Sequence, residues 1–306
     1  MRFLHLSDVH VTQDYLRVPL RRLGWRRAIA MWELTVGGRQ KRYTHSRRTI
    51  ERILEERHQH QVDHVILSGD LTAYATRWEF EQARAALGAL AEDRSRFTVI
   101  PGNHDVYTPG AYNTRRFEQY FGHLLESDLP EYTRDGAFPF VRVLGEDVAL
   151  IGLMSARVPP VPGLSFGVVG RRQLGALRDL VQDERLRHRA VLVVVHHAPV
   201  APSGKKDHLF HGLLDADQLL ALLPGPRFAV LHGHIHQRYH HPATDKRPHT
   251  FGAGSSTEGG HEGYWIIDVR DGLVVGGSAH VPWSGDGAPG EAAPTEWAQD
   301  TRPSVE

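Results

Sequence analysis

The chain has 306 residues with 36 basic and 36 acidic side chains, and it contains no cysteine. A formal net charge of zero argues against a general attraction to nucleic acid. The lack of cysteine excludes disulfides and thiolate metal sites. No signal-peptide pattern follows Met1, and no apolar run reaches the length of a membrane-spanning helix, so we expect a cytoplasmic protein.

Apolar runs bounded by turn residues predict core strands, and helical patterns lie between them. The expected strands are 3–6, 62–67, 97–100, 148–153, 191–195 and 228–231, with antiparallel strands at 138–144 and 264–275. Helical patterns occur near 50–54, 76–90, 174–181 and 219–223, and Thr76 with Glu79 fits a capping box. The alternation of strand and helix predicts an α/β layered fold.

Charge is unevenly distributed at two places along the chain. Residues 15–48 contain ten Lys or Arg and a single acid, Glu33, interleaved with Trp25 and Trp32. This insertion is typical of a basic amphipathic helix, which could pack on the domain, contact an anionic membrane or lipid-like substrate, or form a positive rim for phosphorylated substrates. We expect one domain over 1–283 and a flexible Pro/Gly/acidic tail over 284–306.

Polar side chains follow five of the predicted core strands, at the point where each strand ends. The motifs are Ser7-Asp8-Val9-His10, Ser68-Gly69-Asp70, Gly102-Asn103-His104-Asp105, His196-His197-Ala198-Pro199 and Gly233-His234-Ile235-His236. Sites form at the carboxyl ends of strands in open α/β sheets, so we expect these motifs to converge. In extended backbone, residues two apart point to the same side, which would pair Asp8 with His10 and His234 with His236.

Carboxylate, imidazole and amide groups without thiolates suit ions such as Mn, Fe or Zn. Seven candidate ligands are too many for one open site and suit two metal ions that share a bridging carboxylate. Any one of these residues alone would more often be a turn former, a helix cap or a solvent-facing histidine. Their joint occurrence favours a functional metal site.

The ordered set D-x-H, G-D, G-N-H-D, H-H-x-P and G-H-x-H resembles the calcineurin-like metallophosphoesterase superfamily. It is similar in style to the bacterial class III cyclic-nucleotide and glycerophosphodiester phosphodiesterases. The resemblance runs from Phe3 to about His236, with closing strands to Val281. It implies a metallophosphoesterase-type β-sandwich of two mixed sheets flanked by helices.

The resemblance also implies roles for individual residues. The first metal would be held by Asp8, His10, Asp70 and His236, and the second by Asp70, Asn103, His196 and His234. His196 is preferred over His197 because the family's ligand is the first histidine of its H-H-P-P motif. His104 would contact the phosphoryl group and protonate the leaving oxygen. Asp105 would orient His104.

The function implied is hydrolysis of a phosphodiester by attack of a metal-bound hydroxide, on a cyclic nucleotide, a glycerophosphodiester or a similar small substrate. An alternative is a pyrophosphohydrolase of a nucleotide-linked lipid of the UDP-diacylglucosamine type, which the insertion favours. One branch of that activity carries arginine at the position of His104. A nuclease would need a longer basic track, and a non-catalytic scaffold would be expected to have lost ligands.

The remaining histidines near these motifs have other expected roles. His5, His197 and His232 are predicted to pack in the core or to support the ligands. His208 and His211 lie in the segment 203–212, which could form a loop over the site or a solvated loop.

Overall fold

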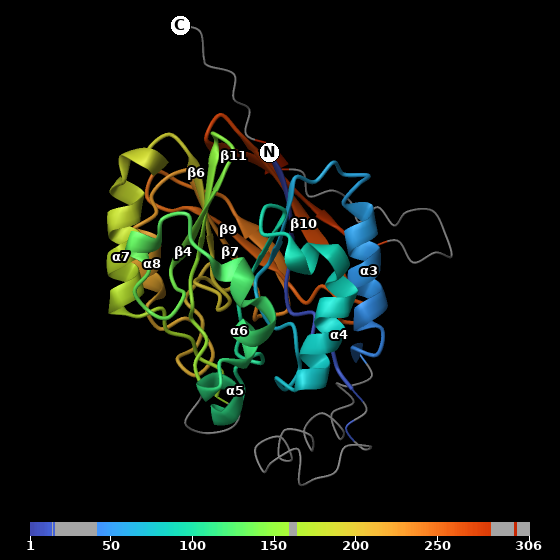
Figure 1. Cartoon of the computed structure of the whole chain (residues 1–306). Coiled ribbons are helices and arrows are strands. Elements are labelled where there is room, and N and C mark those ends of the chain that lie inside the picture. The colour runs from blue at the N-terminus through green and yellow to red at the C-terminus, as the bar shows by residue number, and fades with distance from the viewer. Residues whose placement is uncertain (14, 16–41, 159–163, 283–296, 299–306) are drawn as a thin grey trace, which may run out of the picture.

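Two six-stranded sheets form the centre of the protein, with helices on their outer faces (Figure 1). The computed structural model describes residues 1–13, 15, 42–158, 164–282 and 297–298. The first sheet has the order β12-β11-β10-β1-β2-β3 and the second β4-β5-β6-β7-β9-β8. Both sheets are mixed, because each combines parallel neighbours with antiparallel ones. The predicted fold class is therefore confirmed.

The strands and helices alternate as the sequence predicts. The strands of the first sheet are β1 (Arg2–Leu6), β2 (His64–Leu67), β3 (Phe97–Val99), β10 (Tyr264–Arg270), β11 (Leu273–His280) and β12 (Trp297–Ala298). Those of the second are β4 (Phe140–Leu144), β5 (Val148–Gly152), β6 (Ala190–Val194), β7 (Phe228–His232), β8 (Arg238–His241) and β9 (His249–Ala253). The helices are α3 (Ser46–Glu56), α4 (Arg77–Leu87), α5 (Pro109–Asn113), α6 (Arg116–Phe121), α7 (Arg171–Gln182) and α8 (Ala216–Ala221). Short 3₁₀ helices occur at Gly88–Glu92, Gly122–Leu125, Pro130–Tyr132 and Glu184–Leu186.

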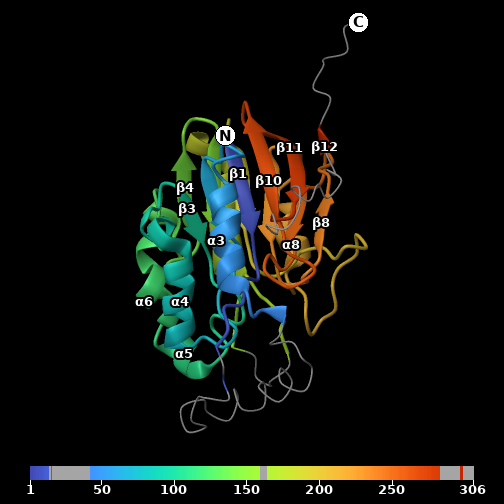
Figure 2. The same ribbon diagram turned by 90° about the vertical axis from the view of Figure 1, so that its right-hand side faces the viewer.

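Strand β6 shows why the apolar runs are continuous rather than alternating. Leu192 and Val194 belong to the core cluster shared with the first sheet. Val191 and Val193 belong to the second cluster, which packs against α7 and α8. A strand covered on both faces buries every side chain, so an uninterrupted apolar run is expected. Figures 1 and 2 show the helices α7 and α8 on one outer face and α3, α4 and α6 on the other.

Two local predictions are resolved by the structure. The capping box is confirmed, because Thr76 accepts a hydrogen bond from the Glu79 N–H while the Glu79 carboxylate accepts one from the Thr76 N–H. The run 264–275 is a hairpin, β10 and β11, rather than a single strand. Its turn contains Asp271 and Gly272, both with positive φ, which is the geometry of tight hairpins.

The insertion and the tail lie mainly outside the described residues. Residues 16–41 of the predicted insertion fall there, while Tyr15 is buried and residues 42–48 lead into α3. Of the predicted tail, Trp297 and Ala298 are described, and they pair with β11. In the part of the chain that the structure describes, no helix has both the length and the apolarity needed to cross a membrane.

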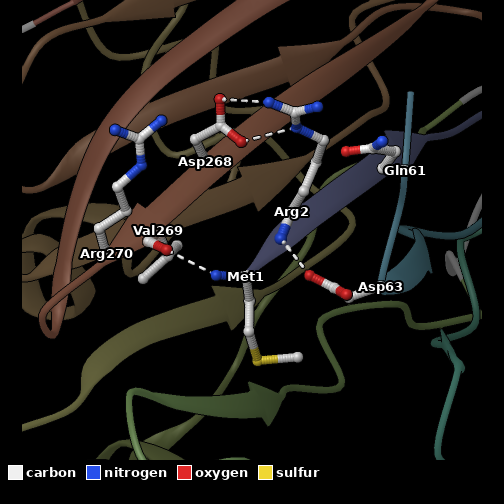
Figure 3. Close-up of a pocket in the computed structure, with 7 residues that line it drawn as sticks. All are labelled: Met1, Arg2, Gln61, Asp63, Asp268, Val269 and Arg270. Atoms are coloured by element: carbon white, nitrogen blue, oxygen red, sulfur yellow. Dashed lines mark hydrogen bonds and ion pairs between the residues drawn. The ribbon is translucent and has the colours of Figure 1, made fainter.

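A cavity of about 320 Å³ lies at the amino-terminal end of β1 (Figure 3). The Arg2 guanidinium pairs with Asp268 at 2.7 Å, and the backbone N–H of Arg2 donates to Asp63 at 2.7 Å. The Met1 ammonium donates to the Val269 carbonyl at 2.7 Å. The polar groups of this cavity thus bond one another, and the predicted ligands follow the opposite end of β1.

Candidate metal centre

The predicted motifs meet at the carboxyl ends of β1, β2 and β3 in one sheet and of β6 and β7 in the other. The loops after β1 and β2 run side by side, because the N–H groups of Asp8 and His10 donate to the carbonyls of Gly69 and Asp70 at 3.0 Å. The loop after β7 joins them, since the His234 N–H donates to Asp8 Oδ2 at 2.9 Å. Segments far apart in sequence thus form one buried cluster.

The first group of donors consists of Asp8, His10 and His236. The Nε2 atoms of His10 and His236 are 3.2 Å apart, and His236 Nε2 is 3.3 Å from Asp8 Oδ1. His10 Nε2 is 3.9 Å from Asp70 Oδ2, which connects this group to the next. These distances place the donors close enough to hold one ion between them.

The second group consists of Asp70, Asn103, His196 and His234. His196 Nε2 lies 3.4 Å from Asp70 Oδ2 and 3.0 Å from Asn103 Oδ1. His234 Nδ1 lies 3.1 Å from the same Asn103 oxygen. Asp70 thus faces both groups. The structure brings all seven predicted ligands together in one cluster, in which donor atoms of Asp8, Asp70 and His196 also lie within 4.8 Å of one another. The assignment of each residue to a metal ion stays a prediction.

The reason given from the sequence for the D-x-H and H-x-H pairing is wrong, because these residues are not in extended backbone. Five predicted ligands have left-handed backbone with φ between 41° and 74°: Asp8, His10, Asp70, His234 and His236. This conformation is uncommon and strained for residues other than glycine, and such strain concentrates at functional sites. Sharp turns after the strands, held by the hydrogen bonds between loops, aim these donors at a common point.

In three of the histidines, one ring nitrogen faces the donor groups and the other has a polar partner outside them. His196 Nδ1 is 2.9 Å from the Ser68 carbonyl, and His234 Nε2 is 3.0 Å from the His211 carbonyl. His236 Nδ1 is 3.3 Å from a Glu258 oxygen. A carbonyl or carboxylate there holds the proton on that nitrogen and leaves the other lone pair for a metal ion.

The electrostatics of the cluster also suit cations. Burial by itself raises the pKa of Asp8, but the imidazole of His236, whose Nε2 lies 3.3 Å from Asp8 Oδ1, lowers it to about 2. Burial likewise opposes ionisation of Asp70, yet the charge of His196 holds its pKa well below the usual range. Burial lowers the pKa of His10 to about 3, so its imidazole is neutral. For His196 burial acts in the same direction, but the charge of Asp70 raises its pKa to about 9.

The donor set fits two metal ions. Asp8 Oδ1 is buried and has no hydrogen-bond partner among the described residues, which is costly unless a ligand occupies that place. Two carboxylates, four imidazoles and an amide oxygen are ligands that Mn, Fe and Zn accept. A bound ion would displace the proton that His196 carries in the metal-free protein.

His104 lies beside the first group with its ring fixed from outside. The backbone N–H of His104 donates to Asp70 Oδ1 at 2.8 Å. The ring nitrogen Nδ1 lies 2.7 Å from the Ala73 carbonyl. The ring packs edge-on against His10 at 4.8 Å and stacks on Tyr107. One of its nitrogens also lies within 4.8 Å of donor atoms of His10 and Asp70, so geometry alone would allow it as a ligand.

The orienting role expected of Asp105 is wrong in its detail. Its carboxylate accepts hydrogen bonds from the N–H groups of Leu71, Thr72 and Gly102 at 2.9–3.1 Å, and one from the Thr72 hydroxyl. The ring of His104 is held by Ala73 instead. Burial and the charge of Asp70 raise the pKa of Asp105 to about 7. Asp105 therefore shapes the backbone that carries Asp70 and Asn103.

Gly102 is needed because the backbone here passes close to Asp70, and not because the turn is left-handed. A Cβ atom at this position would overlap the carboxylate and the N–H of Asp70. Gly102→Ala is expected to displace Asp70 and to lower turnover about a hundredfold, since a misplacement near 1 Å costs about that much. Steady-state kinetics measure the loss. Gly175→Ala is the matched control, because no atom lies within 4 Å of a Cβ there, and equal rates for the two variants would contradict the prediction.

Five further histidines were expected in the core or on a loop near the site, and the structure distinguishes His211 from His208. His5, His197 and His232 are fully buried, and His197 Nδ1 is 2.8 Å from the Ser155 hydroxyl while its ring packs on His234. His211 does lie at the site, with its ring 4.1 Å from that of His234. His208 is exposed and contacts Phe210.

Sequence reasoning missed Tyr43 and Glu258. The Tyr43 hydroxyl is 3.2 Å from His236 Nδ1, and its ring packs edge-on against His10 at 4.9 Å. Glu258 reaches the same His236 nitrogen from the segment after β9. Neither residue belongs to a strand-end motif, so no local pattern marked them.

This fold and this arrangement of donors define a metal-dependent phosphoric ester hydrolase. The chain belongs to the calcineurin-like phosphoesterase family, whose model matches residues 1–238. This family depends on dinuclear metal centres, which agrees with the two donor groups.

Solved structures show the same fold at low sequence identity. A dimetal phosphatase from Danio rerio is 13% identical with a TM-score of 0.60, over 91% of this chain and 94% of that one. The purple acid phosphatase PPD1 from yellow lupin (Lupinus luteus) seeds is 12% identical with a TM-score of 0.52, over 94% of this chain and 52% of that one. PhoD is 12% identical with a TM-score of 0.50, over 97% and 68%. No curated protein matches the sequence.

Proposed function

We propose that this protein hydrolyses a phosphodiester at a two-metal centre. The observation that carries the proposal is the pair of donor groups that share Asp70, with His104 beside them. When bound, two metal ions would neutralise the anionic phosphate and favour the deprotonated form of the attacking water. Asp70 is held by the hydrogen bond from the His104 backbone N–H. His104, held at Nδ1 by Ala73, offers Nε2 to the leaving oxygen.

The charge around the cluster supports a diester over a monoester. Among the described residues, one guanidinium, that of Arg42, takes part in the hydrogen bonds of the site. It already pairs with Glu258 at 2.7 Å. A monoester carries up to one more negative charge than a diester and benefits from additional cationic side chains. The monoanionic diester therefore suits this set of side chains better.

The test is a direct comparison of the two ester classes. We expect metal-free protein reloaded with Mn²⁺ to hydrolyse bis(p-nitrophenyl) phosphate with a higher kcat/KM than p-nitrophenyl phosphate, and a chelator to abolish both activities. A preference for the monoester would overturn the diester proposal. No bound metal and no metal-dependent hydrolysis would overturn the enzyme. Cyclic nucleotides, glycerophosphodiesters and nucleotide-linked lipid pyrophosphates then identify the substrate.

An apolar pair beside the second donor group supports a substrate with an organic portion. Leu209 and Phe210 are 70% and 61% exposed, more than any other large hydrophobic side chain in the described ranges. They directly precede His211, whose carbonyl lies 3.0 Å from a nitrogen of His234. The pair is thus exposed directly before a residue that contacts the predicted ligand His234, where it can contact the organic group of a bound substrate.

Replacing both Leu209 and Phe210 by serine is expected to raise KM for an aryl diester about tenfold, because an apolar contact is worth about 1–3 kcal/mol. KM for a small alkyl diester is expected to stay unchanged. Trp78→Ser is the matched control, since Trp78 is also exposed, at 43%, but belongs to α4. Equal changes for both substrates would argue against this contact.

The basic aromatic insertion supports two further parts of the proposal. Its arginines and tryptophans are suited to peripheral contact with an anionic membrane at the cytoplasmic face, or to a lipid-like substrate. The nucleotide-linked lipid pyrophosphate is the second candidate substrate, and it rests on this composition alone. Activity on that lipid, lost after deletion of residues 20–32, would favour it over the small diester.

A further inference from the structure

Four consecutive residues, 255–258, form a clamp on the first donor group. They follow β9 and have the sequence Ser-Ser-Thr-Glu. The family model ends at residue 238, so the clamp lies outside the matched region. Every one of the four side chains takes part in hydrogen bonds with the first metal motif or its neighbours.

The first three residues of the clamp hold the backbone of the loop after β1. The Ser255 hydroxyl donates to the Asp8 carbonyl at 2.7 Å, and the Thr257 hydroxyl donates to the Val9 carbonyl at 2.6 Å. Ser256 bonds Ser7 twice, through its N–H at 2.9 Å and its hydroxyl at 3.0 Å. These bonds oppose relaxation of the left-handed backbone of Asp8 and His10.

Glu258 completes the clamp at the histidine ring. Its Oε2 atom is 3.3 Å from His236 Nδ1 and accepts a hydrogen bond from the Tyr43 hydroxyl at 3.3 Å. Its Oε1 atom pairs with the Arg42 guanidinium at 2.7 Å. Only 6% of Glu258 is exposed, so its contacts with His236 and Tyr43 are made with little screening by water. The Arg42 side chain is 59% exposed, so its ion pair with Glu258 is screened more strongly.

The position of Glu258 determines how His236 can act. His236 Nε2 faces Asp8 Oδ1 at 3.3 Å, in the first donor group. A carboxylate at Nδ1 holds the proton there, fixes the ring plane and raises the basicity of Nε2 as a ligand. None of the hydrogen bonds of Glu258 reaches Asn103, His196 or His234 of the second group.

We propose that Glu258 is a positioning residue that sets the affinity of the first metal ion through His236, without acting on the second ion. Arg42 and Tyr43, which directly follow the undescribed residues 16–41, hold Glu258 in place. The first ion is therefore connected both to the last part of the insertion, residues 42–48, and to the segment after β9. This inference rests on the metal centre of the proposed function, though not on the identity of the ester.

The experiment titrates metal-free full-length protein with Mn²⁺ by calorimetry. Two binding events are expected for the wild type. Glu258→Gln is expected to weaken one of them by 10- to 100-fold, the usual effect of losing a partner of a metal-binding histidine, and to leave the other unchanged. The weakened event should be the one that His236→Ala removes and His234→Ala retains. Glu184→Gln is the matched control, because Glu184 pairs with Arg187 on the surface.

Each other outcome decides against the inference. Two unchanged events in Glu258→Gln would overturn it while leaving the metal centre intact. Equal weakening of both events, together with a lower Tm, would reveal a merely structural role and overturn it as well. No binding by the wild type would instead remove the proposed function. If Glu258→Gln does not fold, Tyr43→Phe serves, because it removes the hydroxyl that contacts both Glu258 and His236, and the same single event should weaken.

Discussion

Asp70→Asn is expected to lower turnover of a phosphodiester by about 10³-fold. Asp70 faces both donor groups, at 3.9 Å from His10 Nε2 and 3.4 Å from His196 Nε2. Asparagine keeps the shape of the side chain and removes its charge. Metal ions supply several kcal/mol of transition-state stabilisation, and each 1.36 kcal/mol is a factor of ten in rate. Steady-state kinetics and metal analysis of the same sample measure the two effects.

The matched control for this variant is Asp183→Asn. Asp183 is also a largely covered carboxylate with close partners, Tyr132 and Arg185, but it lies beside α7, away from the ligands. The control should retain both metal ions and its full rate. An Asp70→Asn protein that kept both ions and more than about a tenth of its turnover would show that this carboxylate does not bridge them.

His104→Ala is expected to lose activity in a manner that depends on the leaving group. General acid catalysis contributes about 10²–10⁴-fold when the departing oxygen needs a proton. We therefore expect a loss of that size for an alkyl phosphodiester and a small change for bis(p-nitrophenyl) phosphate, whose leaving group departs readily as an anion. The measurement is the ratio of kcat values for the two substrates.

His123→Ala provides the control, because His123 also bonds a backbone carbonyl, that of Ala91 at 2.7 Å, and lies outside the donor groups. Metal content separates the acid role of His104 from a ligand role. A proton donor can be removed without losing an ion, whereas removal of a ligand lowers occupancy. Equal losses for both substrates, or the loss of one ion, would rule out the acid role.

Much of the fold could be predicted from the sequence because the strands are buried on both faces. Runs such as that of β6 are continuously apolar, so their existence and order followed from local composition. The hairpin of β10 and β11 was predicted as one run, since its apolar residues continue close to the turn at Asp271 and Gly272. Strands β8 and β9 were not predicted, and histidines and other polar residues in them interrupt any apolar pattern.

The sequence by itself indicated where the site lies. Each motif directly follows a core strand, and parallel strands bring their carboxyl ends to one edge, so the meeting of the motifs could be predicted without coordinates. The choice of individual donors within them, such as His196 over His197, came from the resemblance. Their residue types also determined the kind of ion they could hold. These properties are local, since they depend on a residue and its immediate neighbours along the chain.

Only the tertiary structure decided how those residues are held. Asp105 bonds the backbone rather than His104, and the ligand turns are left-handed rather than extended. Glu258 reaches His236 across 22 positions and Tyr43 reaches it across 193, distances that no local pattern records. Hydrogen bonds between segments far apart in sequence depend on how the whole chain packs, and they determine which nitrogen of His196, His234 and His236 faces the donor groups.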